Sequence, residues 1–253
     1  MKYYECPLIV RQSIVRQIYA AIEMDLNEDT PLGLRAYFSD ENTHIRKISY
    51  RALGRIYHFR PALQETAIRL LKTLLQDENE LLRQSAAYSL GEIGKKHADA
   101  IFDLLAVALH DNHHKVRNAV IGALKQMGEK NPKALLQFAS AHLHDPDPEV
   151  RREIIHGLEL RGRTHPADVL PFLKELQWES EKRPRKMIVH VLGQISYKEN
   201  CLETVLTDLK TWENLELVEE ALKEILKVHK SYERFSVKTV EEVIEIIRKE
   251  FPE

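Results

Sequence analysis

The feature that most constrains this chain is a repeat of about 34 residues within its 253 residues. Arg151 has an acid six residues before it, an aliphatic residue one before it and a leucine seven after it, and the same set surrounds Arg117 and Arg83. The leucine recurs in six copies, as Leu53, Leu90, Leu124, Leu158, Leu192 and Leu226, and the acid as Asp40, Asp77, Asp111, Asp145, Glu179 and Glu213. Self-similarity at this period predicts a helical solenoid, in which each repeat buries its apolar face against its neighbours.

Each copy is predicted to form two helices joined by the acidic turn. Relative to the marker arginine, apolar or small residues fall at −1, +3, +6 and +7, which places them in one stripe along a helix. Asn42, Asn79 and Asp147 suit the N-cap of this second helix. Another apolar segment precedes each turn, as in "ADAIFDLLAVALH". We call the first helix of each copy helix A and the second helix B.

The repeats end in less regular copies and are flanked by further helical segments. Pro184 replaces the aliphatic residue before Arg185, and Glu219 replaces the marker arginine of the last copy. Residues 8–26 predict an additional N-terminal helix and residues 236–251 a C-terminal capping helix, because end repeats otherwise expose their stacking faces. We therefore expect residues 1–253 to form a single solenoid, with six repeats in residues 30–229.

The pattern "D…VR…AL" leading into "LGEIG" resembles HEAT-like repeats of the phycobilin-lyase type, over roughly residues 30–229. The resemblance implies an all-α fold, a right-handed α-α superhelix (HEAT-like solenoid) of about six helix pairs with terminal capping helices. It also implies that Asp145 and Arg151 are the turn aspartate and helix-B arginine that bond between neighbouring repeats. The acidic and basic cluster in "DPDPEVRREIIHGL" is therefore interpreted as structural, apart from Arg152 and His156, which the repeat leaves free to vary.

The B helices of such a solenoid line its concave face, and repeat proteins use extended concave surfaces to bind partners. The positions expected to face this groove are basic in the first copy, polar in the middle copies and acidic in the last. A second column, one residue before each acidic turn, ends in two tryptophans, which either cover the end of helix A or serve as binding hot spots. The candidate partner-binding residues are Lys47, Arg51, Arg55, Tyr88, Arg152, His156, Trp178, Lys186, His190 and Trp212.

Enzymatic alternatives lack their local motifs. None of the twelve histidines precedes a glutamate, which argues against the HEAT-type metalloenzyme deoxyhypusine hydroxylase. The chain has no P-loop, no GxSxG and no glycine-rich phosphate turn. A shared repeat does not by itself transfer the chemistry of the phycobilin lyases. The tryptophans and the half-basic groove also resemble HEAT-like alkylpurine DNA glycosylases, but that family's local motifs are missing.

Metal binding and membrane insertion find little support in the sequence. Histidines gather around two turns, but their spacing matches no zinc motif and no cysteine supports them; these residues are His110, His113, His114, His142 and His144. No stretch approaches the roughly 18 apolar residues of a membrane span. The two distant cysteines, Cys6 and Cys201, fit a reducing cytoplasm.

The sequence as a whole predicts a cytoplasmic protein-binding scaffold or adaptor. We expect no catalytic residues, no cofactor and no metal, and a partner that offers an acidic surface or segment to the concave face. The alternatives left open are a DNA-binding or DNA-repair protein and a lyase-like HEAT enzyme.

Overall fold

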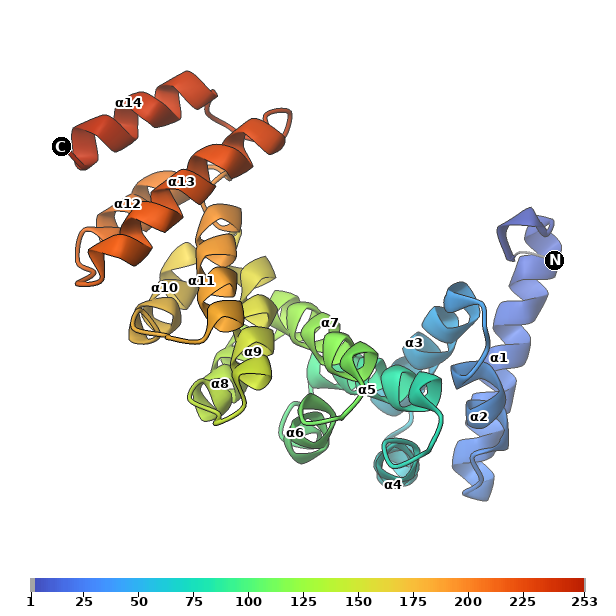
Figure 1. Cartoon of the computed structure of the whole chain (residues 1–253). Coiled ribbons are helices and arrows are strands. Elements are labelled where there is room, and N and C mark those ends of the chain that lie inside the picture. The colour runs from blue at the N-terminus through green and yellow to red at the C-terminus, as the bar shows by residue number, and fades with distance from the viewer. Residues whose placement is uncertain (1–2, 253) are drawn as a thin grey trace. The chain divides into compact units, whose positions relative to one another are not determined.

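A computed structural model describes residues 3–252, in which all regular structure is helical (Figure 1). The chain divides into two compact units, the first ending at Ala134 and the second beginning at Leu135. The A and B helices alternate along the sequence as predicted. The fold is therefore all-α and built from helix pairs.

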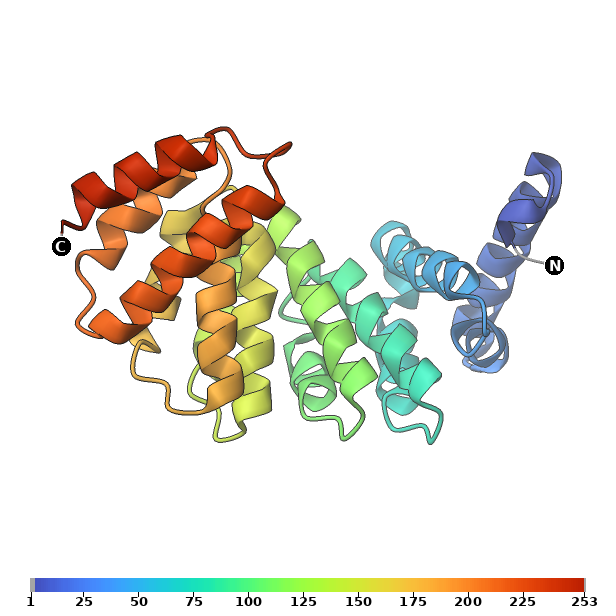
Figure 2. The ribbon, with the colours of Figure 1, turned by 45° about the horizontal axis from the view of Figure 1, so that its top comes forward.

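The first unit begins with a short 3-10 helix, Tyr3–Glu5, and the long helix α1 (Leu8–Glu28), which contacts α2 and α3. Its A helices are α2 (Leu32–Phe38), α4 (Gln64–Leu74, after a 3-10 turn at Pro61–Leu63) and α6 (Phe102–Leu109). Its B helices are α3 (Thr43–Phe59), α5 (Glu80–Gly94) and α7 (His114–Lys130). The B helices pack against one another in sequence order, and α5 and α7 lie side by side (Figure 2).

The second unit repeats this arrangement. Helix α8 (Pro132–His142) leads into it, and α10 (Pro166–Glu175) and α12 (Cys201–Leu209) are its further A helices. Its B helices are α9 (Pro148–Gly162), α11 (Lys182–Gln194) and α13 (Leu215–Ser231), of which α11 packs against both others. The last helix, α14 (Val240–Glu250), contacts α13 and occupies the segment predicted to cap the repeats.

The acidic turn of each repeat prepares the start of helix B. Asn79 caps α5 by accepting a hydrogen bond from the backbone N–H of Leu81 at 2.9 Å, and the side chain of Asp77 accepts from the N–H of Asn79 at 3.0 Å. These bonds satisfy N–H groups at the start of the helix that have no partner within it. The predicted N-caps Asn42 and Asp147 make the equivalent bond, to His44 and Glu149.

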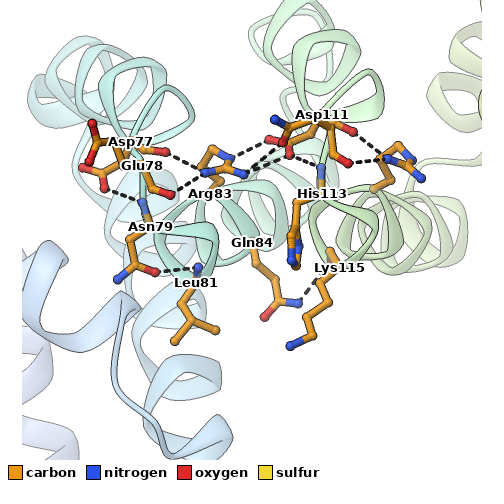
Figure 3. A network of polar contacts seen from close by, with 11 residues as sticks. Asp77, Glu78, Asn79, Leu81, Arg83, Gln84, Asp111, His113 and Lys115 are labelled. Carbon is orange, nitrogen blue, oxygen red and sulfur yellow. Dashed lines mark hydrogen bonds and ion pairs between the residues drawn. The ribbon is translucent and has the colours of Figure 1, made fainter.

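At Arg83 and Arg151 the marker arginine joins its own turn to the turn of the next repeat, as Figure 3 shows for Arg83. Arg83 donates from Nη1 to the carbonyl of Asp77 at 2.7 Å, and from Nε and Nη2 to the carboxylate of Asp111 at 2.7 and 3.1 Å. Arg151 does the same with the carbonyl of Asp145 at 2.8 Å and the carboxylate of Glu179 at 2.6 and 2.9 Å. The predicted structural role of this arginine is therefore confirmed at both positions.

The leucine column forms the centre of the stacked repeats. Leu53, Leu90, Leu124, Leu158 and Leu192 have no exposed surface. Leu226 differs from the prediction because it remains partly exposed, and Ile225 beside it is the fully buried residue. Within the described residues no further helix pair follows α13, so its outer side meets only α14.

Candidate functional site

The solvent-facing side of the B helices, which we call the B-helix face, carries most of the candidate residues. Side chains on this face reach between neighbouring B helices: Arg51 of α3 lies 3.7 Å from Glu92 of α5. In the second unit, Arg183 of α11 pairs with Glu149 of α9 at 2.6 Å. The face is therefore a shared surface within each unit.

In the first unit this face is basic along α3. Lys47, Arg51 and Arg55 follow one another at four-residue intervals, so they form one line along the helix, and all three are exposed. Lys47 forms no ion pair within residues 3–252, and Arg55 makes only a 3.4 Å hydrogen bond to the hydroxyl of Tyr19. Exposed contacts of this kind are weak, so the three positive charges remain available to a partner.

Two tyrosines stack beside this line. The rings of Tyr50 (α3) and Tyr88 (α5) have centroids 5.0 Å apart and planes 21° from parallel. Burial is the main cause that raises the pKa of Tyr50 to about 12, and burial also raises the pKa of Tyr88. Both phenols therefore stay neutral at physiological pH. Gly122 of α7 makes room for this pair, because a Cβ there would lie 2.6 Å from a ring carbon of Tyr88.

The three cations line two clefts of the first unit. One, of about 400 Å³, is lined by Thr43, His44, Arg46, Lys47, Tyr50, Gln84, Ser85 and Tyr88. The other, of about 430 Å³, is lined by Val15, Tyr19, Ile48, Arg51, Arg55, Glu92 and Lys95. Each cleft thus combines positive charge with aromatic surface.

In the second unit all candidate residues on this face except Lys186 lie close to acids. Arg152 donates to Glu149 at 3.1 Å and to Glu153 at 3.0 Å, and only 14% of its side chain is exposed. Lys186 is exposed. The charge of Arg152, in contrast, is neutralised by these two glutamates. This part of the face therefore presents less free positive charge than the sequence suggested.

The buried Glu159 lies between the two candidate histidines of this unit, His156 and His190. Glu159 lies 3.1 Å from Nε2 of His156 and pairs with Arg163 at 2.5 Å. Nε2 of His190 lies 4.0 Å from Glu159, and its Nδ1 lies 4.0 Å from Glu224 of α13. The two candidate histidines are thus brought together around carboxylates that link three B helices.

The two tryptophans occupy equivalent turn positions but differ in burial. Trp212 is 4% exposed, and its Nε1–H donates to Asp208 at 2.7 Å, so it covers the end of α12. Trp178 is 63% exposed and lies in the turn after α10. Trp212 is therefore structural, and it offers a partner no accessible indole.

The histidine-rich turns show no arrangement suited to a metal. His144 pairs with Glu175 at 2.6 Å, and His110 contacts the carbonyl of Ala106 at 2.9 Å. Among residues 3–252, no group of three or more His, Cys, Asp or Glu side chains is placed to hold an ion. No helix in that part of the chain has both the length and the apolar character to cross a membrane.

Sequence reasoning missed Tyr50 and Tyr19. Tyr50 lies four residues after its marker arginine, between the core stripe and the predicted groove positions, while Tyr19 lies outside the repeats on α1. One signal in the sequence could have indicated that the two tyrosines lie close together. Tyr50 and Tyr88 are separated by nearly the same number of residues as Arg46 and Arg83, the markers of the first two copies, which are 37 residues apart.

Each unit consists of stacked helix pairs whose B helices form one face. Arg83 and Arg151 join neighbouring turns. These features define a helical-repeat protein. The sequence pattern of the HEAT repeats matches residues 31–125 and, in a second overlapping match, residues 68–141. HEAT repeats are therefore shown in residues 31–141, and the helix pairs of the second unit have the same HEAT-like arrangement that the sequence resemblance predicted.

Comparison with solved structures agrees with this fold. AlkD2 from Streptococcus mutans is 18% identical, with a TM-score of 0.50, and the match covers 83% of this chain and 98% of that chain. The protein smu.31 from Streptococcus mutans UA159 is 17% identical, with a TM-score of 0.49 and coverage of 82% and 97%. At 18% identity, the likeness to AlkD2 shows the fold alone. A search of curated proteins found no match to this chain.

Proposed function

We propose that this protein is a scaffold or adaptor that binds an acidic protein segment on the B-helix face of its first unit. The observation that carries the proposal is the line of Lys47, Arg51 and Arg55, which is exposed and borders two clefts. Carboxylates of the partner would meet these cations, and its apolar side chains would meet the Tyr50–Tyr88 pair. Complementary charge of this kind favours fast and selective association.

The proposal extends to the second unit through the candidates that remain accessible there. Lys186 is exposed and His190 is partly exposed, so both are offered as further contacts on the B-helix face. Trp178 lies in a turn outside the B helices, so it is not part of this face. Because Cys6 and Cys201 form no disulfide, we place this function in the cytoplasm.

Duplex DNA is a poorer match for the same face. DNA binding depends on several cations that each neutralise a phosphate. Here the available cations form one short line on α3, and in the second unit Glu149 and Glu153 neutralise Arg152. We therefore expect DNA affinity no better than the non-specific range of about 10⁻⁴–10⁻⁶ M at physiological salt.

The test is a comparison of an acidic peptide with a DNA duplex. A labelled peptide of about 15 residues composed of Glu and Leu is titrated at about 150 mM salt against the wild type and against the triple variant Lys47→Glu, Arg51→Glu, Arg55→Glu. Hot-spot residues dominate interfaces, so we expect the triple variant to bind at least about tenfold more weakly. A variant with the same charge change outside the B helices, Lys72→Glu, Lys96→Glu, Lys133→Glu, should bind as the wild type does.

Two results would contradict the proposal. Equal loss of binding in both triple variants would show that only net charge matters. Submicromolar binding of plain or alkylated duplex DNA, or release of a base from it, would replace the scaffold function by the DNA-repair alternative.

A further inference from the structure

Trp178 is exposed at a position where the repeat does not require exposure. Its counterpart Trp212, 34 residues later, is buried and hydrogen-bonded to Asp208. The indole of Trp178 makes no hydrogen bond or ring contact with any residue between 3 and 252, and 63% of the residue is accessible. Tryptophan is enriched among the residues that dominate binding energy, so an indole with no structural partner points to an external one.

A second exposed apolar residue, Leu215, follows the other half of a buried contact between two turns. The side-chain oxygen of Gln177 accepts from the N–H groups of Glu213 and Asn214 at 2.8 and 3.1 Å. Asn214 Nδ2 donates back to the carbonyl of Gln177 at 2.7 Å. Trp178 and Leu215 directly follow the two clamped residues, and Leu215 is 75% exposed. We call this pair the Trp178–Leu215 edge.

This clamp prepares the edge for binding. Gln177 and Asn214 are both buried, so the backbone on each side is fixed before a partner arrives. A preorganised surface loses little conformational entropy on association. Both residues belong to the second unit, so the edge is a property of that unit alone.

Two unpaired acids flank the edge. Residues 175–181 and 213–220 contain seven acids, of which five pair with basic side chains: Glu175 with His144, Glu179 with Arg151, Glu216 and Glu220 with Arg185, and Glu219 with Lys223. Glu181 and Glu213 are exposed and form no ion pair within the described part of the chain. Two unpaired carboxylates next to exposed apolar side chains favour a cationic partner over nucleic acid or an acidic peptide.

We propose that the Trp178–Leu215 edge binds a cationic protein segment that carries an apolar anchor side chain. The anchor would bury apolar surface against Leu215 and the indole, and a Lys or Arg beside it would lie over the indole face, where cation–π attraction acts. Glu181 and Glu213 would pair with its remaining cations. This site does not depend on the proposed function of the B-helix face, and its charge preference is the opposite.

The test uses a designed peptide as the probe. An amphipathic peptide of about 16 residues with Leu at helical spacing and Lys elsewhere is titrated at about 150 mM salt, followed by anisotropy of a label and by tryptophan emission. The chain has two tryptophans, and Trp212 is buried, so we expect the emission change to come from Trp178. Trp178→Ala or Leu215→Ala should weaken binding about tenfold or more, and Glu181→Gln with Glu213→Gln should weaken it and reduce its salt dependence.

Three controls test whether the edge itself binds the Lys peptide. Phe235→Ala removes another exposed apolar side chain of the second unit and should bind like the wild type. The same peptide with Glu in place of Lys should not bind the edge. The triple variant at Lys47, Arg51 and Arg55 should keep its affinity for the Lys peptide, so failure here is distinguishable from failure of the proposed function. Because Trp178 and Leu215 are exposed, thermal melting should verify that their variants remain folded.

Three outcomes would overturn the proposal. The first is a folded Trp178→Ala variant that binds the Lys peptide as tightly as the wild type. The second is equal binding of the Glu and Lys peptides at the edge. The third is a wild-type dimer in sedimentation that becomes monomeric on Trp178→Ala, because the edge would then bind a second copy of this chain.

Discussion

At the residue scale, the marker arginines Arg83 and Arg151 each bond two turns at once. Nη1 of Arg151 donates to a carbonyl of its own turn, while Nε and Nη2 hold both oxygens of Glu179 in the next repeat. Only the planar, five-donor guanidinium can direct these bonds in two directions, so a lysine would not replace it. Burial by itself raises the pKa of Glu179, but hydrogen bonds from Arg151 and from the N–H of Glu181 lower the pKa below its usual value. The carboxylate is therefore ionised at neutral pH.

We predict that Arg151→Ala lowers the free energy of unfolding by about 3 kcal/mol, because it leaves a buried carboxylate without its cation. Only 15% of the Arg151 side chain and 5% of the Glu179 side chain are exposed. The matched control is Lys223→Ala, which breaks the exposed Lys223–Glu219 pair of the irregular last copy and should change little. Urea denaturation of the two variants makes the comparison, and equal shifts would show that Arg151 is not a ladder residue.

The candidate site was partly predictable at this scale. The exposure of Lys47, Arg51 and Arg55 follows from helical spacing alone. Arg152 is neutralised by Glu149 and Glu153. Periodicity places all three residues on one helix, but it does not predict the side-chain rotamers that bring them into contact. Trp178 is exposed and Trp212 is buried because their neighbouring side chains differ. Trp212 donates to Asp208, and a repeat pattern does not reveal such a contact.

At the element scale, close contact between B helices requires a small residue at the crossing. A Cβ on Gly91 of α5 would lie 2.6 Å from Cα and 2.7 Å from Cβ of Ala123 on α7. Backbone atoms cannot give way as a flexible side chain can, so the two helices would have to separate. The glycine in the "LGEIG" motif is thus explained by packing between neighbouring repeats.

We predict that Gly91→Ala destabilises the protein by about 1–3 kcal/mol, the usual cost of overpacking, despite the better helix propensity of alanine. Gly94→Ala in the same helix is the control. The nearest atom to its new Cβ would be the sulfur of Met127 at 3.0 Å, at the flexible end of a side chain. Thermal melts should place Gly94→Ala clearly above Gly91→Ala, and the reverse order would refute the assigned crossing point.

The helices themselves were largely predictable, since caps and stripes are local signals. The N-caps Asn42, Asn79 and Asp147 lie where the sequence placed them. Partial exposure of Leu226 was not predictable, because the repeat pattern assigns the same environment to every copy. The true environment depends on the elements that pack against a copy in space, and after α13 the described chain adds a single helix.

At the scale of the whole molecule, a repeat protein is stabilised by the sum of its repeats and of the interfaces between neighbours. A repeat with a neighbour on each side has two such interfaces, whereas the last repeat of the described chain has a neighbouring repeat on one side only. The same leucine position should therefore contribute unequally along the chain. Leu124 of α7 has no exposed surface, and Leu226 of α13 remains partly exposed.

We predict that Leu124→Ala costs about 2–5 kcal/mol, through lost transfer free energy and the cavity left behind. Leu226→Ala should cost less, because its side chain already meets solvent and leaves a smaller cavity. Chemical denaturation of both variants provides the measurement, with Val107→Ala, which truncates an exposed side chain of α6, as the surface control. If Leu124→Ala shifts the unfolding midpoint no more than Val107→Ala does, the leucine column is not the centre of the stacked repeats. If Leu226→Ala costs as much as Leu124→Ala, the last repeat is stabilised as strongly as an inner one, and the contact of α14 with α13 replaces a complete neighbouring repeat.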